Sequence, residues 1–117
     1  MAAQVKFGQI VWVEIADANG IRKSRPAIIV TKNDRITPSG PLEVVAITSF
    51  LPDPIPDDHV LLPWHAQKHP RTGLNRQSAA VCSWQARINA GDIQSVAGSV
   101  PGPILLEIMS KVSSPPP

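Results

Sequence analysis

Two short stretches of the sequence carry the side chains best suited to hold an anion. Arg25 precedes Pro26 and four apolar residues, and Thr48 and Ser49 close a second apolar run. Proline at the first residue of a strand costs no ladder hydrogen bond and keeps the residue before it extended, which predicts Arg25 at a strand mouth. The start of one antiparallel strand faces the end of the next. A guanidinium and a hydroxyl can therefore converge on one anion, as a phosphodiester site requires.

Both stretches also have an ordinary structural interpretation. Arg25 can be a solvated loop charge, and the hydroxyls of Thr48 and Ser49 can satisfy nearby backbone groups.

Metal, nucleotide-loop and thiol chemistry are not favoured by the sequence. His65 and His69 have i,i+4 spacing, but Pro70 argues against a helix there and no third ligand accompanies them. The chain has neither G-x-G-x-x-G nor G-x-x-x-x-G-K. Cys82 lies in a predicted strand, where a single cysteine is usually a small buried hydrophobe. We therefore expect no metal and no cofactor.

The cations are concentrated in two segments, although the formal net charge is only +2. They are Arg22, Lys23, Arg25, Lys32 and Arg35 in the first segment, and Lys68, Arg71 and Arg76, with His65 and His69, in the second. If the segments meet in space, they form a positive face that attracts phosphates. The alternative is two solvated loops that point in different directions.

Length and composition predict one domain with a real core. No apolar run approaches the roughly 18 residues of a membrane span. The first eight residues lack the apolar centre of a signal peptide, so we expect a cytoplasmic protein. Cys82 is the only cysteine, which excludes an intrachain disulfide.

Alternating apolar runs between turn signals predict five strands and one C-terminal helix. The predicted strands span residues 8–16, 25–31, 42–50, 59–63 and 78–88. A helical turn is expected near Asp92, and the final helix presents one apolar face: Ile104, Leu105, Ile108, Met109 and Val112. The three tryptophans are expected to pack in the core and at its rim.

These elements predict a mainly β fold with a C-terminal helix, a small antiparallel barrel or half-barrel. We expect residues 1–112 to form a single domain and residues 113–117 to form a flexible, proline-rich tail.

The order of these features resembles the MazF/PemK toxins over about residues 7–112. The resemblance rests on "GQIVWVEI", "RPAIIV", "VVAITS" and "TGL", followed by a strand and an amphipathic helix. Members of this family are ribosome-independent endoribonucleases of bacterial toxin–antitoxin pairs. The resemblance implies an SH3-like barrel that forms a two-fold homodimer, with an acidic antitoxin that wraps over the active sites.

The resemblance also implies a reaction and two catalytic residues, Arg25 and Thr48. The reaction is metal-free attack of an RNA 2′-hydroxyl on the adjacent phosphate, which leaves a cyclic phosphate and a free 5′-hydroxyl. The requirement for a 2′-hydroxyl selects single-stranded RNA over DNA. We expect the RNA to contact these residues: Arg22, Lys23, Ser49, His69, Arg71 and Arg76.

The chain departs from some relatives in the residues available as a general base. The fifth predicted strand carries Val81, Cys82 and Ser83 where some relatives have an arginine and an aspartate, and the loop after the first strand lacks a histidine. The remaining candidates for the base are Glu14, His59, His69 or a water.

Two other functions stay open at this point. A non-catalytic family member would bind RNA or a protein through the same face. A plain SH3-like adaptor would use an aromatic groove for proline-rich ligands, which a chain with no tyrosine, three tryptophans and two phenylalanines disfavours.

Overall fold

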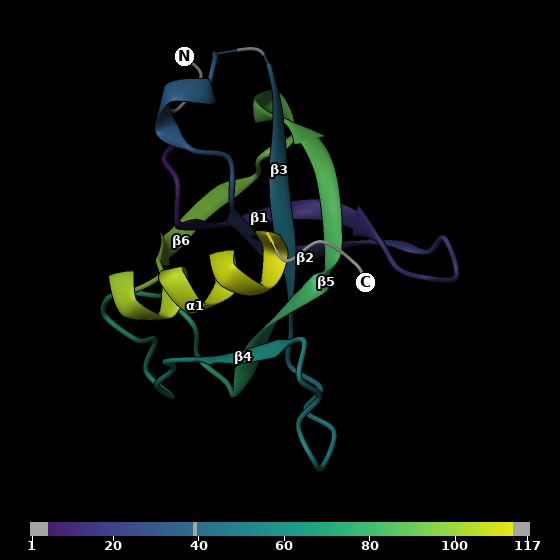
Figure 1. Cartoon of the computed structure of the whole chain (residues 1–117), viewed down its shortest axis with the longest axis vertical. Helices are drawn as coiled ribbons and strands as arrows, with labels where there is room; N and C mark the ends of the chain where they lie inside the picture. Colours follow the sequence, from purple (N-terminus) through teal and green to yellow (C-terminus); the bar gives the residue numbers. More distant parts are fainter. Residues whose placement is uncertain (1–4, 39, 114–117) are drawn as a thin grey trace.

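The computed structural model describes residues 5–38 and 40–113, which form one curved antiparallel sheet with a helix packed against it (Figure 1). The elements in chain order are β1 (Gln9–Ala16), β2 (Arg22–Ile29), a 3-10 turn (Asn33–Arg35), β3 (Pro41–Thr48), β4 (His59–Leu62), β5 (Ser78–Asn89), a second 3-10 turn (Ala90–Asp92), β6 (Ser95–Ser99) and α1 (Gly102–Ser113). The strand order is β4-β5-β3-β2-β1-β6, and all neighbours are antiparallel. The sheet is bent but not closed, since β4 and β6 lie at its edges. The predicted mainly β, barrel-like fold is confirmed.

Buried apolar side chains lie on both faces of this sheet. The first core includes Ile28, Val45 and, from the helix, Ile108. The second core lies on the other face and includes Ala27 and Ala46. Successive side chains of a strand point to opposite faces, so the residues of β2 and β3 alternate between the two cores.

The helix α1 covers the first core, where it packs against β4 and β5 (Figure 1). All the apolar residues predicted to face the protein contribute to this core: Ile104, Leu105, Ile108, Met109 and Val112. Pro103 lies in the first turn, where its missing N–H costs nothing. The predicted amphipathic helix is therefore confirmed.

The strand β2 begins at Arg22, three residues earlier than predicted. The Asp17 carboxylate accepts the backbone N–H groups of Asn19 and Ile21 at 2.8 and 3.0 Å, which tightens the connection from β1. Pairing resumes at once, with Ala16 opposite Arg22. The expectation that Arg25 stands at a strand mouth is wrong, because three residues of β2 precede it.

The strand β6 was not predicted at all. Its sequence, SVAGS, lacks the apolar alternation that marks a strand, and its pairing comes from the edge of β1. Close contact with the loop before β5 also places it, since a Cβ on Gly98 would lie 2.2 Å from the Arg71 carbonyl oxygen.

The turn expected near Asp92 is present as the 3-10 turn Ala90–Asp92, capped by reciprocal contacts between Asn89 and Asp92. Of the expected tail, residues 114–117 lie outside the described residues. No helix within the described part of the chain is long and apolar enough to span a membrane.

Candidate active site

Pro26 lies inside β2, where it ends the pairing between β2 and β3. Its partner on β1 is Trp12, whose carbonyl accepts an N–H on the β6 side. The backbone groups of Trp12 therefore point toward β6, and those of Pro26 point away from β1, toward β3. A proline cannot donate to that ladder. The pairing of β2 with β3 accordingly ends with Ala27 opposite Ala46. We call the parted ends of the two strands, residues 22–26 and 47–48, the fork.

Arg25 is half-buried at the fork, on the face of the second core. Its Nη2 lies 3.6 Å from Asp17 Oδ2, and its Nε makes a long hydrogen bond of 3.4 Å to the carbonyl of Ile15. The guanidinium also lies 5.0 Å above the centre of the Trp84 ring, within the range of a cation–π contact. Arg25 is therefore a positioned cation and not a solvated loop charge.

Thr48 is the last residue of β3, two residues before the predicted end of that strand, and lies at the same end of the sheet as Arg25. Extending the register of Ala27 with Ala46 by two residues places Thr48 opposite Arg25. The Thr48 Oγ1 accepts the N–H of Phe50 at 3.1 Å, and the hydroxyl keeps its own hydrogen to donate. A guanidinium and a hydroxyl thus flank the fork on one face.

The position or the contacts of each side chain considered as a general base argue against that role. Glu14 is on the opposite face of β1 and pairs with Arg22 at 2.9 Å. His59 stands on β4, separated from β3 by β5, with its Nδ1 2.7 Å from Asp58. The third candidate, His69, accepts two backbone N–H groups at Nδ1, which places its proton on Nε2 and makes the ring a donor.

Asp17 is the carboxylate that the fold brings to Arg25, and the sequence indicated it only as a turn residue. The backbone N–H of Ile21 is the main cause that lowers the pKa of Asp17, and the N–H of Asn19 and the charge of Arg25 act in the same direction. A carboxylate with a lowered pKa is a weak proton acceptor. Asp17 is therefore suited to orient Arg25 rather than to act as a base.

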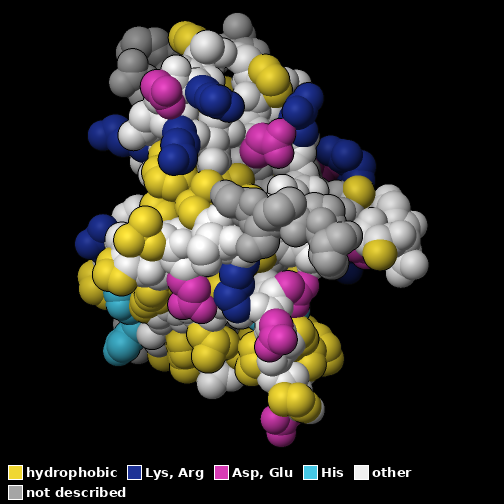
Figure 2. Space-filling model, in the orientation of Figure 1, with side chains coloured by type: hydrophobic (Ala, Val, Ile, Leu, Met, Phe, Trp, Pro, Cys, Tyr) yellow, Lys and Arg dark blue, Asp and Glu magenta, His cyan; other side chains and the backbone are white. Residues whose placement is uncertain are grey.

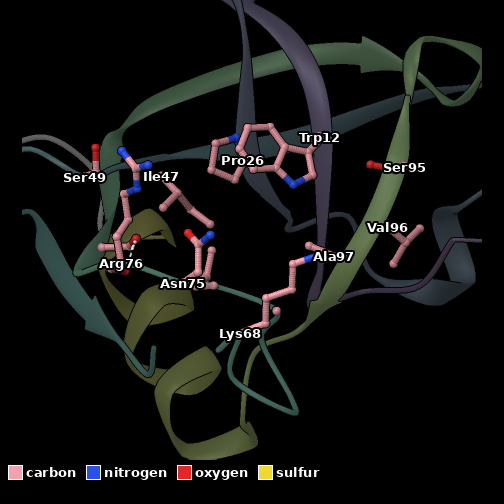
Figure 3. A pocket seen from close by; sticks show the side chains of 13 residues that line it. Trp12, Pro26, Ile47, Ser49, Lys68, Asn75, Arg76, Ser95, Val96 and Ala97 are labelled. Atoms are coloured by element: carbon pink, nitrogen blue, oxygen red, sulfur yellow. Dashed lines mark hydrogen bonds between the residues drawn. The ribbon is translucent and has the colours of Figure 1, made fainter. Parts of the chain in front are cut away.

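A hollow of about 630 Å³ lies on the reverse face of the fork, and we call it the rear hollow (Figure 3). Figure 3 shows Trp12 and Pro26 side by side at one wall, and Arg76 and Ser49 at another. Lys68 reaches into the hollow from the loop before β5. Ser49 and Arg76, two residues expected to bind RNA, are brought together here, on the opposite side of the sheet from Arg25.

The two cationic segments do not form one continuous face. The first is split along β2, because the last four residues of that strand lie between Arg25 and Lys32 and hold them roughly 20 Å apart. Lys32 and Arg35 instead line a second hollow with Arg87, at the opposite end of β3. Figure 2 shows lysine and arginine side chains gathered at this upper end of the molecule.

The other residues expected to bind RNA are dispersed around the fork. By strand alternation Lys23 shares the face of Arg25, whereas Arg22 shares the face of its ion-pair partner Glu14. Arg71 supplies a carbonyl that accepts the N–H of Ser99, which ties its loop to β6. Among the described residues, no group of three His, Cys, Asp or Glu side chains is placed to hold a metal ion.

The described residues form a bent antiparallel sheet with a helix over one face and a cationic fork, which together define a small half-open barrel. Its architecture is that of the MazF toxins. A crystal structure of MazF from Deinococcus radiodurans superimposes with a TM-score of 0.74 at 16% identity, covering 94% of each chain.

Two further solved structures share this fold. A MazE–MazF complex from the same organism gives a TM-score of 0.68 at 17% identity and covers 92% of both chains. The toxin MazF-mt6 from Mycobacterium tuberculosis gives 0.59 at 20% identity, covering 86% of this chain and 90% of its own. No family model matches the sequence, and no curated protein matches it.

Proposed function

We propose that this chain is a MazF-like toxin that cleaves single-stranded RNA without a metal ion. The observation that carries the proposal is the fork, where Arg25 is held opposite Thr48 at the end of two parted strands. The MazF fold supports it, since the chain aligns with those toxins over most of its length. The reaction is attack of an RNA 2′-hydroxyl on the adjacent phosphate.

Arg25 is suited to stabilise the extra negative charge of the pentacoordinate phosphate. Its planar guanidinium is cationic and offers two parallel N–H donors that match the geometry of a phosphate. The contacts to Asp17 and to the Ile15 carbonyl are long, at 3.6 and 3.4 Å, so both can yield to a phosphate. The stack on Trp84 keeps the guanidinium in place meanwhile.

Thr48 donates its hydroxyl hydrogen to a phosphate oxygen in this proposal. The N–H of Phe50 already occupies one acceptor site of Oγ1, which orients the hydroxyl. A water serves as the base, because Glu14 is paired with Arg22 on the face opposite Arg25, His59 stands on β4 beyond β5, and Nδ1 of His69 already accepts backbone N–H groups.

The partners follow from the same proposal. Two of the structures that share this fold are MazE–MazF complexes. We propose an acidic antitoxin for this chain as well, attracted by its cations, and therefore a complex that weakens as salt is raised. We also propose that the chain acts as a homodimer in the cytoplasm, and light scattering at micromolar concentration tests the dimer.

The central experiment is single-turnover cleavage of a labelled, unstructured RNA in the presence of EDTA. Replacing Arg25 with Ala should slow cleavage by roughly 100-fold or more, the scale of removing one transition-state donor. Arg25→Lys should recover little, because an ammonium cannot form the forked contact. Thr48→Val should slow cleavage while RNA binding persists.

The matched control is Arg87→Ala, which removes an equal charge at the opposite end of the sheet. Arg87 is exposed and pairs with Glu43 at 3.0 Å, so cleavage should stay within a few fold of wild type. Wild-type cleavage that requires a divalent metal, or an Arg25→Ala variant that cleaves at the wild-type rate, would refute the proposed site.

A non-catalytic RNA-binding protein is the second candidate. The low pKa of Asp17 favours it, because the acid beside Arg25 is a weak base. Binding of RNA without cleavage by the wild-type chain would decide for this alternative.

A further inference from the structure

We propose that the rear hollow binds one unpaired nucleotide of the RNA strand, with its base against Trp12 and its phosphate between Lys68 and Arg76. This inference rests on the proposed function, because it extends the RNA path from the fork to the reverse face of the sheet. It assigns specific roles to Lys68, which was expected only as one of the clustered cations, and to Trp12, which was expected to pack in the core or at its rim.

The lining of the hollow has the composition of a nucleotide site. Lys68 and Arg76 are cationic, and none of the described residues that line the hollow is acidic. Trp12 leaves 38% of its surface exposed, so an indole face is open to stack with a base. Hydrogen-bonding groups elsewhere in the lining come from the following side chains: Ser49, Asn75, Ser78 and Ser95. An acidic peptide would match the two cations but would not account for the exposed face of Trp12.

The loop that carries Lys68 and Arg76 is held in place by its own hydrogen bonds. Thr72 is fully buried, donates to the carbonyl of Pro63 at 2.8 Å and accepts the N–H of Leu74 at 3.2 Å. Lys68 itself has a φ of 70°, which a non-glycine residue adopts only where its surroundings require it. Little ordering of the backbone is therefore needed when a ligand binds.

Close backbone contact fixes this loop against β6 as well. Gly73 has a φ of 73°, and a Cβ there would lie 2.2 Å from the carbonyl oxygen of Ala97, which also lines the hollow. The N–H of Ser99 donates to the Arg71 carbonyl at 2.8 Å. The loop before β5 and the strand β6, which both line the hollow, are thus held together by close packing and a hydrogen bond.

The fork places the hollow one residue away from the proposed catalytic side chains. Pro26 and Ser49 line the hollow, and they follow Arg25 and Thr48 directly in the chain. A strand of RNA that crosses the fork can present its scissile phosphate on one face and a neighbouring nucleotide on the other.

The test measures binding of a fully 2′-O-methylated RNA, which lacks the attacking hydroxyl and cannot be cleaved. Trp12→Ala should weaken binding about 10- to 100-fold, and Trp12→Phe should keep most of the affinity. Lys68→Asn tolerates the positive φ and removes the charge, and Arg76→Gln removes the other cation. Each should weaken binding and reduce the dependence of log K on log salt by about one.

Arg87→Gln is the control, since it removes an equal charge at the opposite end of the sheet and should leave binding unchanged. Thermal melting checks that every variant is folded. Wild-type affinity in the folded Trp12→Ala and Lys68→Asn variants would overturn the inference, even where wild-type RNA is cleaved. Variants that no longer bind a glutamate-rich peptide but still bind the RNA with wild-type affinity would overturn the inference in favour of a peptide site.

The same assay separates this inference from the proposed catalysis. Arg25→Ala should slow cleavage by roughly 100-fold or more but retain most binding of the methylated RNA. A chain that binds this RNA through the hollow and never cleaves a natural one would refute the catalytic proposal alone.

Discussion

Replacing Gly73 with Ala tests whether contact between the loop before β5 and β6 holds the rear hollow together. Gly73 has a positive φ of 73°, which costs an alanine about 1–2 kcal/mol. The new Cβ would also lie 2.2 Å from the Ala97 carbonyl oxygen, far inside ordinary contact. Such overpacking against backbone typically adds about 1–3 kcal/mol. We therefore expect a loss of about 3 kcal/mol and a melting temperature lower by roughly 10 °C.

Gly20→Ala is the matched control for this prediction. Gly20 has a similar φ of 80°, but nothing lies within 4 Å of a Cβ built there. It should lose only the backbone contribution, about 1 kcal/mol, part of which is offset by a less flexible unfolded chain. Calorimetric melting of both variants at one protein concentration gives the comparison. Equal melting temperatures would refute the argument that close packing on β6 constrains the loop.

Three further predictions concern the scaffold. Hydrogen bonds from Ser83 and then His59 lower the pKa of Asp58 below its ordinary value of 3.8, so the ionised carboxylate stabilises the fold above that pH. The Asp58→Asn variant should therefore have a lower melting temperature than wild type at pH 7. This difference should vanish in strong acid, where the wild-type carboxyl is protonated. Thr72→Val should cost about 1–3 kcal/mol in denaturant unfolding, whereas Thr72→Ser should cost less because it keeps the hydroxyl. Burial raises the pKa of the Cys82 thiol, so a thiol reagent at pH 8 should label it slowly until denaturant is added.

Periodicity in the sequence was enough to predict five of the six strands and the final helix. The apolar runs of β1, β3 and β5 are long and β-branched, and the stripe from Ile104 to Val112 has helical spacing. The strand β6 could not be found in this way, because SVAGS has little apolar content of its own. Its place depends on the edge of β1 and on two glycines that let a distant loop approach.

The arrangement of the candidate site could likewise be predicted only where neighbouring strands determine it. That Arg25 and Thr48 share one end of the sheet follows from antiparallel neighbours, which sequence order already indicates. The contact of Arg25 with Trp84 joins segments far apart in the chain, and its contact with Asp17 crosses the connection from β1 to β2; no local pattern indicates either contact. The first cationic segment looked continuous in the sequence, yet the strand within it carries Lys32 to the far end of the molecule from Arg25.

The effect of a proline in a strand depends on which neighbour its nitrogen faces, and this cannot be read from sequence alone. The nitrogen of Pro26 faces β3, so the missing N–H removes one rung between two central strands while pairing with β1 continues. Because side chains alternate, the same interruption leaves Arg25 over the second core and turns Pro26 toward the rear hollow. A cation directly before a proline is thus placed at the point where the sheet opens, with Arg25 on one face of the sheet and the rear hollow on the other.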